Sequence, residues 1–270
     1  MTGSVAALWR YPVKSMLGEE LDATAIDEDG LLGDRAYALV DGADGKIVSA
    51  KNPRKWERLF ACSAAFDTVL TTGEPVPPAR ITLPDGSVLS TAQADAERVL
   101  SRALARDVTI DTRERAPQAP RGEEYRADLE GFRERDTVTD FNLRPGSFFD
   151  AGIVHVLTTA TLARLAEFYS QGRFDARRFR PNVVVRTPDD APDFPEETWL
   201  ERTLAIGSEV RLQVTKRCSR CVMTTLAQGD LPNDSGILRA VAQRNDAVVG
   251  VYAVVARGGT IRRGDAVTVE

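Results

Sequence analysis

Two cysteines spaced as Cys-x-x-Cys are the residues of this chain best suited to do chemistry. Cys218 and Cys221 are flanked by Arg217 and Arg220. Positive neighbours favour the thiolate, which is the form of cysteine that binds metals or attacks electrophiles. Taken alone, this segment is compatible with a metal ligand, with a redox pair, or with two partly buried structural cysteines.

The rest of the chain limits what this cysteine pair can be. A zinc site would need further ligands, and only Cys62 and His155 remain, without the spacing of a zinc motif. A thioredoxin-like redox pair opens a helix that follows a strand, whereas β-prone residues follow Cys221. Because the chain has one histidine, a site built from several imidazoles is excluded.

Two phrases in the first part of the chain offer groups that can hold an anion. Lys14 and Ser15 end the phrase Tyr-Pro-Val-Lys-Ser and could hold a phosphate through a charge and a hydroxyl. A surface lysine after a proline turn is the simpler interpretation of that phrase alone. In the phrase Gly-Asp-Arg, Arg35 either pairs with Asp34 or faces an anion.

A third phrase, Arg-Pro-Asn, precedes a buried-looking strand. Phe179 and the valines after the phrase anchor it, so Arg180 and Asn182 can present a guanidinium fork and an amide to a polar heterocycle or a phosphate. A basic loop with one capping asparagine is the alternative. Asp150 lies just before the strand that contains His155, and that histidine is expected to be structural because no motif surrounds it.

Short strands separated by turn signals predict the elements that position these residues. The expected strands are residues 5–11, 35–40, 46–50, 79–83, 87–90, 153–157, 182–185, 210–215 and 248–255. The expected helices, each with an apolar stripe, are residues 92–106, 159–170 and 235–244. This pattern favours a mainly β (α+β) fold, with a β-barrel in the second half and a smaller mixed β domain in the first.

Charged and helix-breaking residues between positions 111 and 134 predict a linker or exposed loop. We therefore expect an N-terminal domain at residues 1–110, a linker at 111–134 and a barrel domain at 135–268. The groups that could hold an anion come from both halves, so their site is expected between the two domains.

Composition narrows the class of protein. The net charge is −5 with 28% charged residues, which argues against nonspecific binding to nucleic acid or to an anionic membrane. No segment has the pattern of a targeting signal or a membrane span. Three cysteines do not form a disulfide framework. We expect a cytoplasmic protein that is a monomer or a weak dimer.

Taken together and in this order, the four phrases resemble those of the MOSC family. Tyr-Pro-Val-Lys-Ser and Gly-Asp-Arg are similar to its N-terminal β-barrel-like domain, and Arg-Pro-Asn and Cys-x-x-Cys to the MOSC domain itself. The likeness covers nearly the whole chain. Within the family, it points to the mitochondrial amidoxime-reducing components and to bacterial reductases of N-hydroxylated compounds.

The resemblance implies a cofactor and gives roles to residues. In the family, the second cysteine binds the molybdenum of the molybdenum cofactor, Mo-molybdopterin, so the metal-ligand and catalytic role falls on Cys221. The implied cofactor-binding residues are Lys14, Ser15, Arg35, Asp150, Arg180 and Asn182. Before the strand at 153–157 the family often has a longer polar phrase, of which only Asp150 is present here.

The resemblance also implies an activity: a molybdenum-dependent oxidoreductase that reduces small N-hydroxylated substrates. No cysteine cluster follows Cys221, so the electrons are expected from a separate donor, ferredoxin-like or a flavin reductase. The alternative is a non-catalytic carrier of molybdenum cofactor or sulfur. Pyridoxal phosphate is a further cofactor candidate, because MOSC domains occur fused to desulfurases that use it, but Lys14 beside so many anion-binding groups is a poor Schiff-base lysine.

Overall fold

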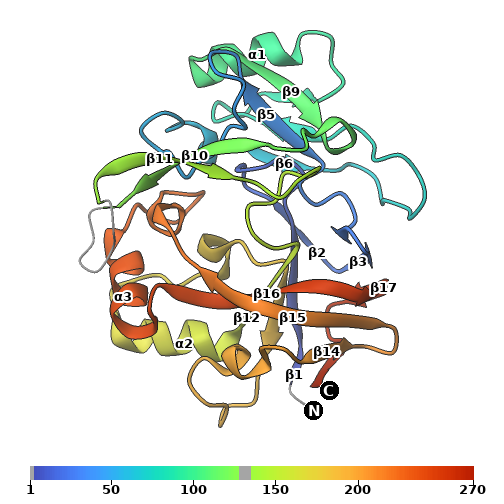
Figure 1. Cartoon of the computed structure of the whole chain (residues 1–270), viewed down its shortest axis with the longest axis vertical. Coiled ribbons are helices and arrows are strands. Elements are labelled where there is room, and N and C mark those ends of the chain that lie inside the picture. The colour runs from blue at the N-terminus through green and yellow to red at the C-terminus, as the bar shows by residue number, and fades with distance from the viewer. Residues whose placement is uncertain (1–2, 128–134) are drawn as a thin grey trace.

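The computed structural model describes residues 3–127 and 135–270, and most of its regular structure is β (Figure 1). The mainly β fold predicted from the sequence is confirmed, with three α-helices in the described residues. None of these helices is both long and apolar enough to cross a bilayer.

The central element is a closed barrel of seven strands in the described part of the chain, in the order β13-β12-β16-β15-β14-β18-β1, closed by the pairing of β1 with β13. A short strand, β2, extends the sheet beyond β1. The bounds are β1 Gly3–Arg10, β2 Glu19–Leu21, β12 Val154–Thr158, β13 Val183–Arg186, β14 Thr203–Ile206, β15 Val210–Ser219, β16 Val248–Arg257 and β18 Ala266–Val269.

Alternation of apolar residues explains why these segments form a barrel. In β15, Val210, Leu212 and Val214 are buried, whereas the residues between them are half-exposed. Side chains of a strand alternate between its two faces, so one face of each barrel strand fills the interior. The buried side chains of Leu8 and Val183 belong to the same cluster as those of β15.

The first half of the chain forms smaller sheets above the barrel. Strand β5 (Tyr37–Asp41) pairs with β9 (Val108–Thr112), and β6 (Ser63–Ala65), β7 (Arg80–Thr82) and β8 (Val88–Ser90) form a meander. The hairpin predicted at 79–90 is confirmed. The strand predicted at 46–50 is wrong, because this segment makes only isolated bridges, from Ile47 to Val40 and to Gly122.

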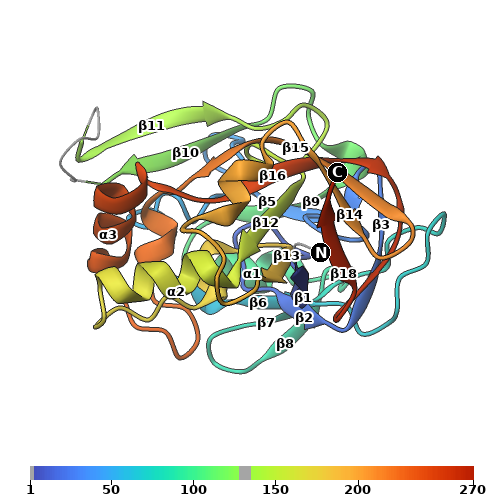
Figure 2. The ribbon, with the colours of Figure 1, turned by 90° about the horizontal axis from the view of Figure 1, so that it is seen from below.

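The three predicted helices are confirmed, with shorter bounds for two of them. They are α1 Ala96–Leu104, α2 Thr159–Phe168 and α3 Ser235–Asn245. The side chains of Thr158 and Asp234 accept backbone N–H groups at the starts of α2 and α3. Figure 2 shows α2 and α3 together at one end of the barrel. Single-turn 3₁₀ helices lie at η1 Leu59–Ala61, η2 Arg113–Arg115, η3 Ala176–Phe179, η4 Pro195–Trp199 and η5 Val222–Thr225.

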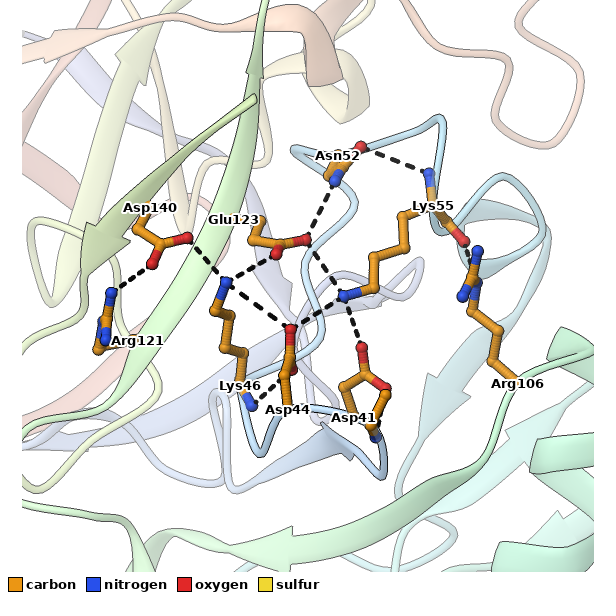
Figure 3. Close-up of polar contacts among 10 residues, drawn as sticks. Asp41, Asp44, Lys46, Asn52, Lys55, Arg106, Arg121, Glu123 and Asp140 are labelled. Carbon is orange, nitrogen blue, oxygen red and sulfur yellow. Dashed lines mark hydrogen bonds and ion pairs between the residues drawn. The ribbon is translucent and has the colours of Figure 1, made fainter. Parts of the chain in front are cut away.

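The segment predicted as a linker differs from that expectation. Residues 128–134 lie outside the described residues, but β10 (Arg121–Arg126) pairs with β11 (Thr137–Asn142) in a two-stranded ribbon. The sequence of β10 lacks the alternation of apolar and polar residues from which a strand can be predicted. Ion pairs stabilise it instead, since Glu123 pairs with Lys46 at 2.7 Å and with Lys55 at 3.2 Å (Figure 3).

The two halves of the chain share their sheets. Strands β1 and β2 belong to the barrel sheet, and β3 (Ala23–Asp27) lies between β4 (Gly30–Leu31) and the late strand β17 (Gly259–Arg262). The sheets therefore do not divide at residue 110. This sharing fixes the phrases of the first half against the barrel, where the candidate site lies.

Candidate functional site

All seven residues predicted for the site line one cavity of about 350 Å³. Segments from both halves of the chain form it, as expected from the sequence. Its wall is strongly positive. The lining includes two acidic residues, Glu124 and Asp150. It includes more basic residues, namely Lys14, Arg35, Lys51, Arg126, Arg180, Lys216, Arg217 and Arg220.

Asp150 lies between two lysines of this wall. Its carboxylate contacts Lys14 Nζ and lies 3.1 Å from Lys51 Nζ. Lys14 Nζ also donates to the carbonyl oxygen of Phe148 at 2.9 Å. Burial lowers the pKa of Lys14 to about 8 even though Asp150 opposes the shift. Asp150 thus holds two ammonium groups at the cavity.

Arg35 and Asn182 converge on a buried carboxylate, Asp34. Arg35 pairs with Asp34, and its guanidinium lies 4.5 Å from the centre of the Tyr11 ring. Asn182 Nδ2 donates to Asp34 Oδ2 at 2.9 Å and to Trp9 O at 3.3 Å, and its Oδ1 accepts the N–H of His155. Both amide hydrogens of Asn182 are therefore used by the protein itself.

Arg180 and Ser15 are held by backbone groups of the first half. Arg180 Nη1 donates to Met16 O at 2.6 Å, and its guanidinium stacks 4.1 Å from the centre of the Tyr11 ring. Burial lowers the pKa of Arg180 to about 10, so the group remains charged at neutral pH. Ser15 Oγ accepts the N–H of Ala50 at 3.2 Å, which leaves its own hydrogen free to donate.

Three of these residues have a left-handed backbone. The φ angles are 65° at Ser15, 49° at Arg35 and 53° at Arg180. Non-glycine residues rarely adopt this region, and such conformations gather at functional sites where the surroundings enforce them. This backbone geometry is independent of the charges and points to the same residues.

The two cysteines of the Cys-x-x-Cys phrase have different surroundings. Cys221 lines the cavity and is partly exposed, whereas Cys218 is fully buried. Burial by itself raises the pKa of the Cys218 thiol, but Arg220 and His155 outweigh it and bring the pKa down to about 6. Arg220 Nη1 donates to Cys218 Sγ. Cys218 is thus a buried sulfur that accepts from Arg220, and Cys221 is the sulfur that faces the cavity.

A buried arginine holds the loop that carries Cys221. Arg178 is fully buried and donates to the carbonyl oxygens of Thr224, Leu226 and Pro232. A charge inside the protein needs such partners. Arg178 therefore fixes η5, whose first turn begins directly after Cys221.

His155, expected to be structural, also reaches the cavity wall. Its Nε2 lies 3.1 Å from Val249 O, and its Nδ1 lies 3.4 Å from Arg180 O. Gly250 is required beside it, because a Cβ at that position would lie 2.3 Å from His155 Nε2. His155 therefore links the segments that contain Val249 and Arg180, as expected of a structural residue.

Sequence reasoning missed several lining residues. Lys51 follows an apolar run just as Lys14 follows a strand end, and this signal could have identified it. Glu124 and Arg126 lie on the unrecognised strand β10 and had no signal. Phe148 and Phe149 line the cavity as well, just before the predicted strand at 153–157, and so does Tyr252, which lies within the predicted strand at 248–255.

The comparisons with known proteins identify the family of this chain. The family model for the MOSC domain matches residues 145–268, and the model for the MOSC N-terminal beta barrel domain matches residues 2–75. Mitochondrial amidoxime-reducing component 1 of Homo sapiens is 27% identical over 98% of this chain and 82% of its own length. Mitochondrial amidoxime reducing component 2 of Macaca fascicularis is 30% identical over 83% of this chain and 67% of its own length.

A solved structure, the YUAD protein from Bacillus subtilis, aligns with 100% of this chain and 96% of its own, at 13% identity and a TM-score of 0.49. That likeness is too weak to add to the sequence matches. The two family models cover both halves of the chain, and the relatives align across the phrases that meet at the cavity. This chain belongs to the MOSC family.

Proposed function

We propose that this protein binds the molybdenum cofactor through Cys221 and reduces N-hydroxylated compounds with electrons from a separate donor. The relatives named above are amidoxime-reducing components, and an amidoxime is an N-hydroxylated amidine. The single observation that supports the proposal most is the position of Cys221, a partly exposed sulfur on the same wall as the cationic groups.

The charge of the wall fits an anionic cofactor. The lining includes eight basic side chains against two carboxylates, Glu124 and Asp150, and a third carboxylate, Asp34, pairs with Arg35. The basic side chains therefore outnumber the acidic ones at this cavity. Buried charges need compensation, and the dianion of a phosphate monoester supplies it.

The donor set also fits a metal that brings ligands of its own. Among the described residues, no group of three or more His, Cys, Asp or Glu side chains could hold a metal ion. One cysteine sulfur, Cys221, lines the cavity, and such a soft ligand would suit a metal whose other ligands include the sulfurs of a pterin dithiolene. Cys221 would hold the metal, and Lys14, Ser15, Arg35 and Arg180 would hold the anionic end.

The contacts of Asn182 and Asp150 narrow their proposed roles. Asn182 donates both amide hydrogens to protein oxygens, so it orients Asp34 and the strand that carries His155. Asp150 is occupied by two lysines. We propose that both residues act mainly by positioning the groups that touch the cofactor.

In the proposed reaction an amidoxime takes up two electrons and two protons, its N–O bond breaks, and an amidine and water leave. When bound, the cofactor supplies the metal that accepts and passes on the two electrons. The chain itself binds and orients that group through the basic wall. Lys216 and Arg217 are exposed at the mouth of the cavity and could attract an acidic donor protein.

Metal analysis tests the ligand assignment. Protein made in a host that synthesises the cofactor should contain about one molybdenum per chain, as one cavity-facing thiolate allows. Cys221→Ser should abolish bound molybdenum, whereas Cys218→Ser, which removes the sulfur turned away from the cavity, should keep most of it. Full molybdenum in both variants, or loss only in the Cys218 variant, would show that the assignment is wrong.

Turnover separates a reductase from a carrier. The purified protein should reduce an amidoxime such as benzamidoxime with reduced viologen and not with NADH alone. Turnover with NADH and no partner would refute the need for a separate donor. A molybdenum-loaded protein that is inactive even with viologen would favour a carrier of the cofactor.

A further inference from the structure

Lys51 is a partly buried lysine of the cavity that none of the four phrases includes. Its side chain is 16% exposed, and it lines the cavity beneath the β10–β11 ribbon. Its carbonyl oxygen accepts the N–H of Tyr125 at 2.7 Å, so the backbone at Lys51 is fixed to β10. Lysines are rarely buried unless they are paired, and the partners of Lys51 therefore decide its role.

Among the residues that the structure describes, the ammonium group of Lys51 has fewer acceptors than hydrogens. Nζ lies 3.1 Å from Asp150 Oδ2 and 4.1 Å from the centre of the Phe141 ring. Glu124 Oε2 is 3.8 Å away, which is beyond hydrogen-bond distance. An ammonium group has three N–H donors. One carboxylate oxygen accepts one of them, so Lys51 can donate to a further anion.

Lys14 shares the carboxylate that Lys51 uses. Both ammonium groups contact Asp150. Their mutual repulsion adds to the effect of burial, which is the main cause of the lowered pKa of Lys14. Two ammonium groups on one carboxylate leave a positive charge at this point of the wall, and an anion placed between them would relieve that repulsion.

The strand β10 places a competing carboxylate beside Lys51. Side chains alternate along a strand, so Glu123 faces the ion pairs with Lys46 and Lys55 shown in Figure 3, whereas Glu124 faces the cavity. Arg126, two residues further on the same face, pairs with Glu124 at 2.7 Å. The ion pairs on the outer face thus hold an acid and its arginine against the cavity.

We infer that Lys51 is a further anion-binding residue of this site, which acts together with Lys14 on the anionic end of the bound group, and that Glu124 competes with the anion for Lys51. The inference rests on the proposed function only in that it uses the same cavity. It adds a ligand from a segment outside the four phrases and makes the β10–β11 ribbon part of the binding site.

Sulfate, a dianion that does not titrate near neutral pH, is the probe. Binding to the full-length protein, made without cofactor, is measured by calorimetry. Because a hydrogen bond to a charged group is strong, Lys51→Met should weaken sulfate binding by about tenfold or more. Arg98→Met is the control, since it removes a positive charge from the exposed face of α1, outside the cavity lining, and it should change binding by less than about threefold. Glu124→Gln should tighten binding.

The outcomes distinguish this inference from the proposed function. If Lys14→Met weakens binding and Lys51→Met does not, the inference is wrong while the cofactor site stands. If the wild-type protein binds no sulfate, both the inference about Lys51 and the proposed anion-binding role of the cavity are wrong. Should Lys51→Met not fold, Lys51→Arg and Lys51→Gln decide, because the arginine variant should keep binding and the glutamine variant should lose it. Equal binding by those two variants would overturn the inference.

Discussion

Glu196 is a fully buried carboxyl group, and its surroundings predict a specific dependence of stability on pH. Its Oε2 accepts hydrogen bonds from Thr158 Oγ1 at 2.6 Å and from Thr161 Oγ1 at 2.7 Å. Its Oε1 has no hydrogen-bond partner in the described part of the chain. Burial raises the pKa of Glu196 above the ordinary value of 4.5, and the two hydroxyl groups offset this only in part.

The sign of the effect follows from linkage. A carboxyl whose pKa is raised in the folded state binds its proton more tightly there than in the unfolded chain. Its contribution to stability is complete below the unfolded pKa and is lost as the pH rises through the folded pKa. Each unit of upward shift corresponds to about 1.4 kcal/mol, or roughly 2–4 °C in the melting temperature of a chain of this size.

The test is Glu196→Gln, which keeps an acceptor for both threonines and carries no charge. Thermal unfolding of the variant and the wild type is compared from about pH 4.5 to pH 8, so that effects of other groups cancel in the difference. The variant should gain stability relative to the wild type as the pH rises from about 4.5 to 8, because only the wild type must then ionise a buried carboxyl or keep its proton. A difference that does not change with pH would refute the reasoning.

The neighbouring acid provides a control of opposite sign. Glu197 Oε2 pairs with Arg217 at 2.7 Å, and its Oε1 accepts from Asn245 Nδ2 at 2.6 Å. Glu197→Gln removes a favourable charge interaction and should lose stability at pH 8. A gain of stability in both variants would point to a general effect of negative charge in this region and not to the burial of Glu196.

Three further outcomes are expected. Lys55→Met should lower the free energy of unfolding by about 2–3 kcal/mol in a urea titration, because Asp41, whose side chain is 4% exposed, loses its cation; the loss should shrink in the double variant with Asp41→Asn. Sulfate binding should weaken as the pH rises through about 8, where Lys14 loses its proton, and Lys14→Arg should remove that dependence, as calorimetry at several pH values would show. Electron transfer from an acidic donor should slow as salt is raised, because Lys216 and Arg217 lie exposed at the mouth; a rate independent of salt would exclude steering by these charges.

Local signals explain why most of the fold could be predicted. The helices could be predicted from an apolar stripe and a capping residue, such as Thr158 before α2. Strand β15 was visible because its buried residues alternate. Strand β10 was missed because its sequence, Arg-Gly-Glu-Glu-Tyr-Arg, is stabilised by ion pairs with residues about seventy positions away, such as Glu123 with Lys46. A charged strand of this kind has the composition of a loop.

The same difference between local signals and contacts distant in the sequence explains which site residues could be predicted and which could not. In each recognisable phrase a chemical group stands beside its own buried anchor: Lys14 follows Tyr11, Arg35 follows Asp34, and Arg180 follows Phe179. Arg35 and Arg180 have a left-handed backbone, which costs stability and has to be supported by the surrounding structure. The buried anchor and the charged side chain are therefore close together in the sequence, so the phrase that contains them can be recognised.

Lys51 follows buried residues of its own segment, Val48 and Ala50, but no phrase marks it, and Glu124 has no local anchor. Lys51 is placed by backbone pairing with β10 and by Asp150, which is distant in the sequence. Glu124 is placed by the pairing of β10 with β11 and by ion pairs on the opposite face of the strand. Their positions are a property of the assembled fold, because each depends on contacts that exist only once β10 has paired. In a site of this kind, the sequence therefore predicts only those residues whose buried anchors are close to them in the chain.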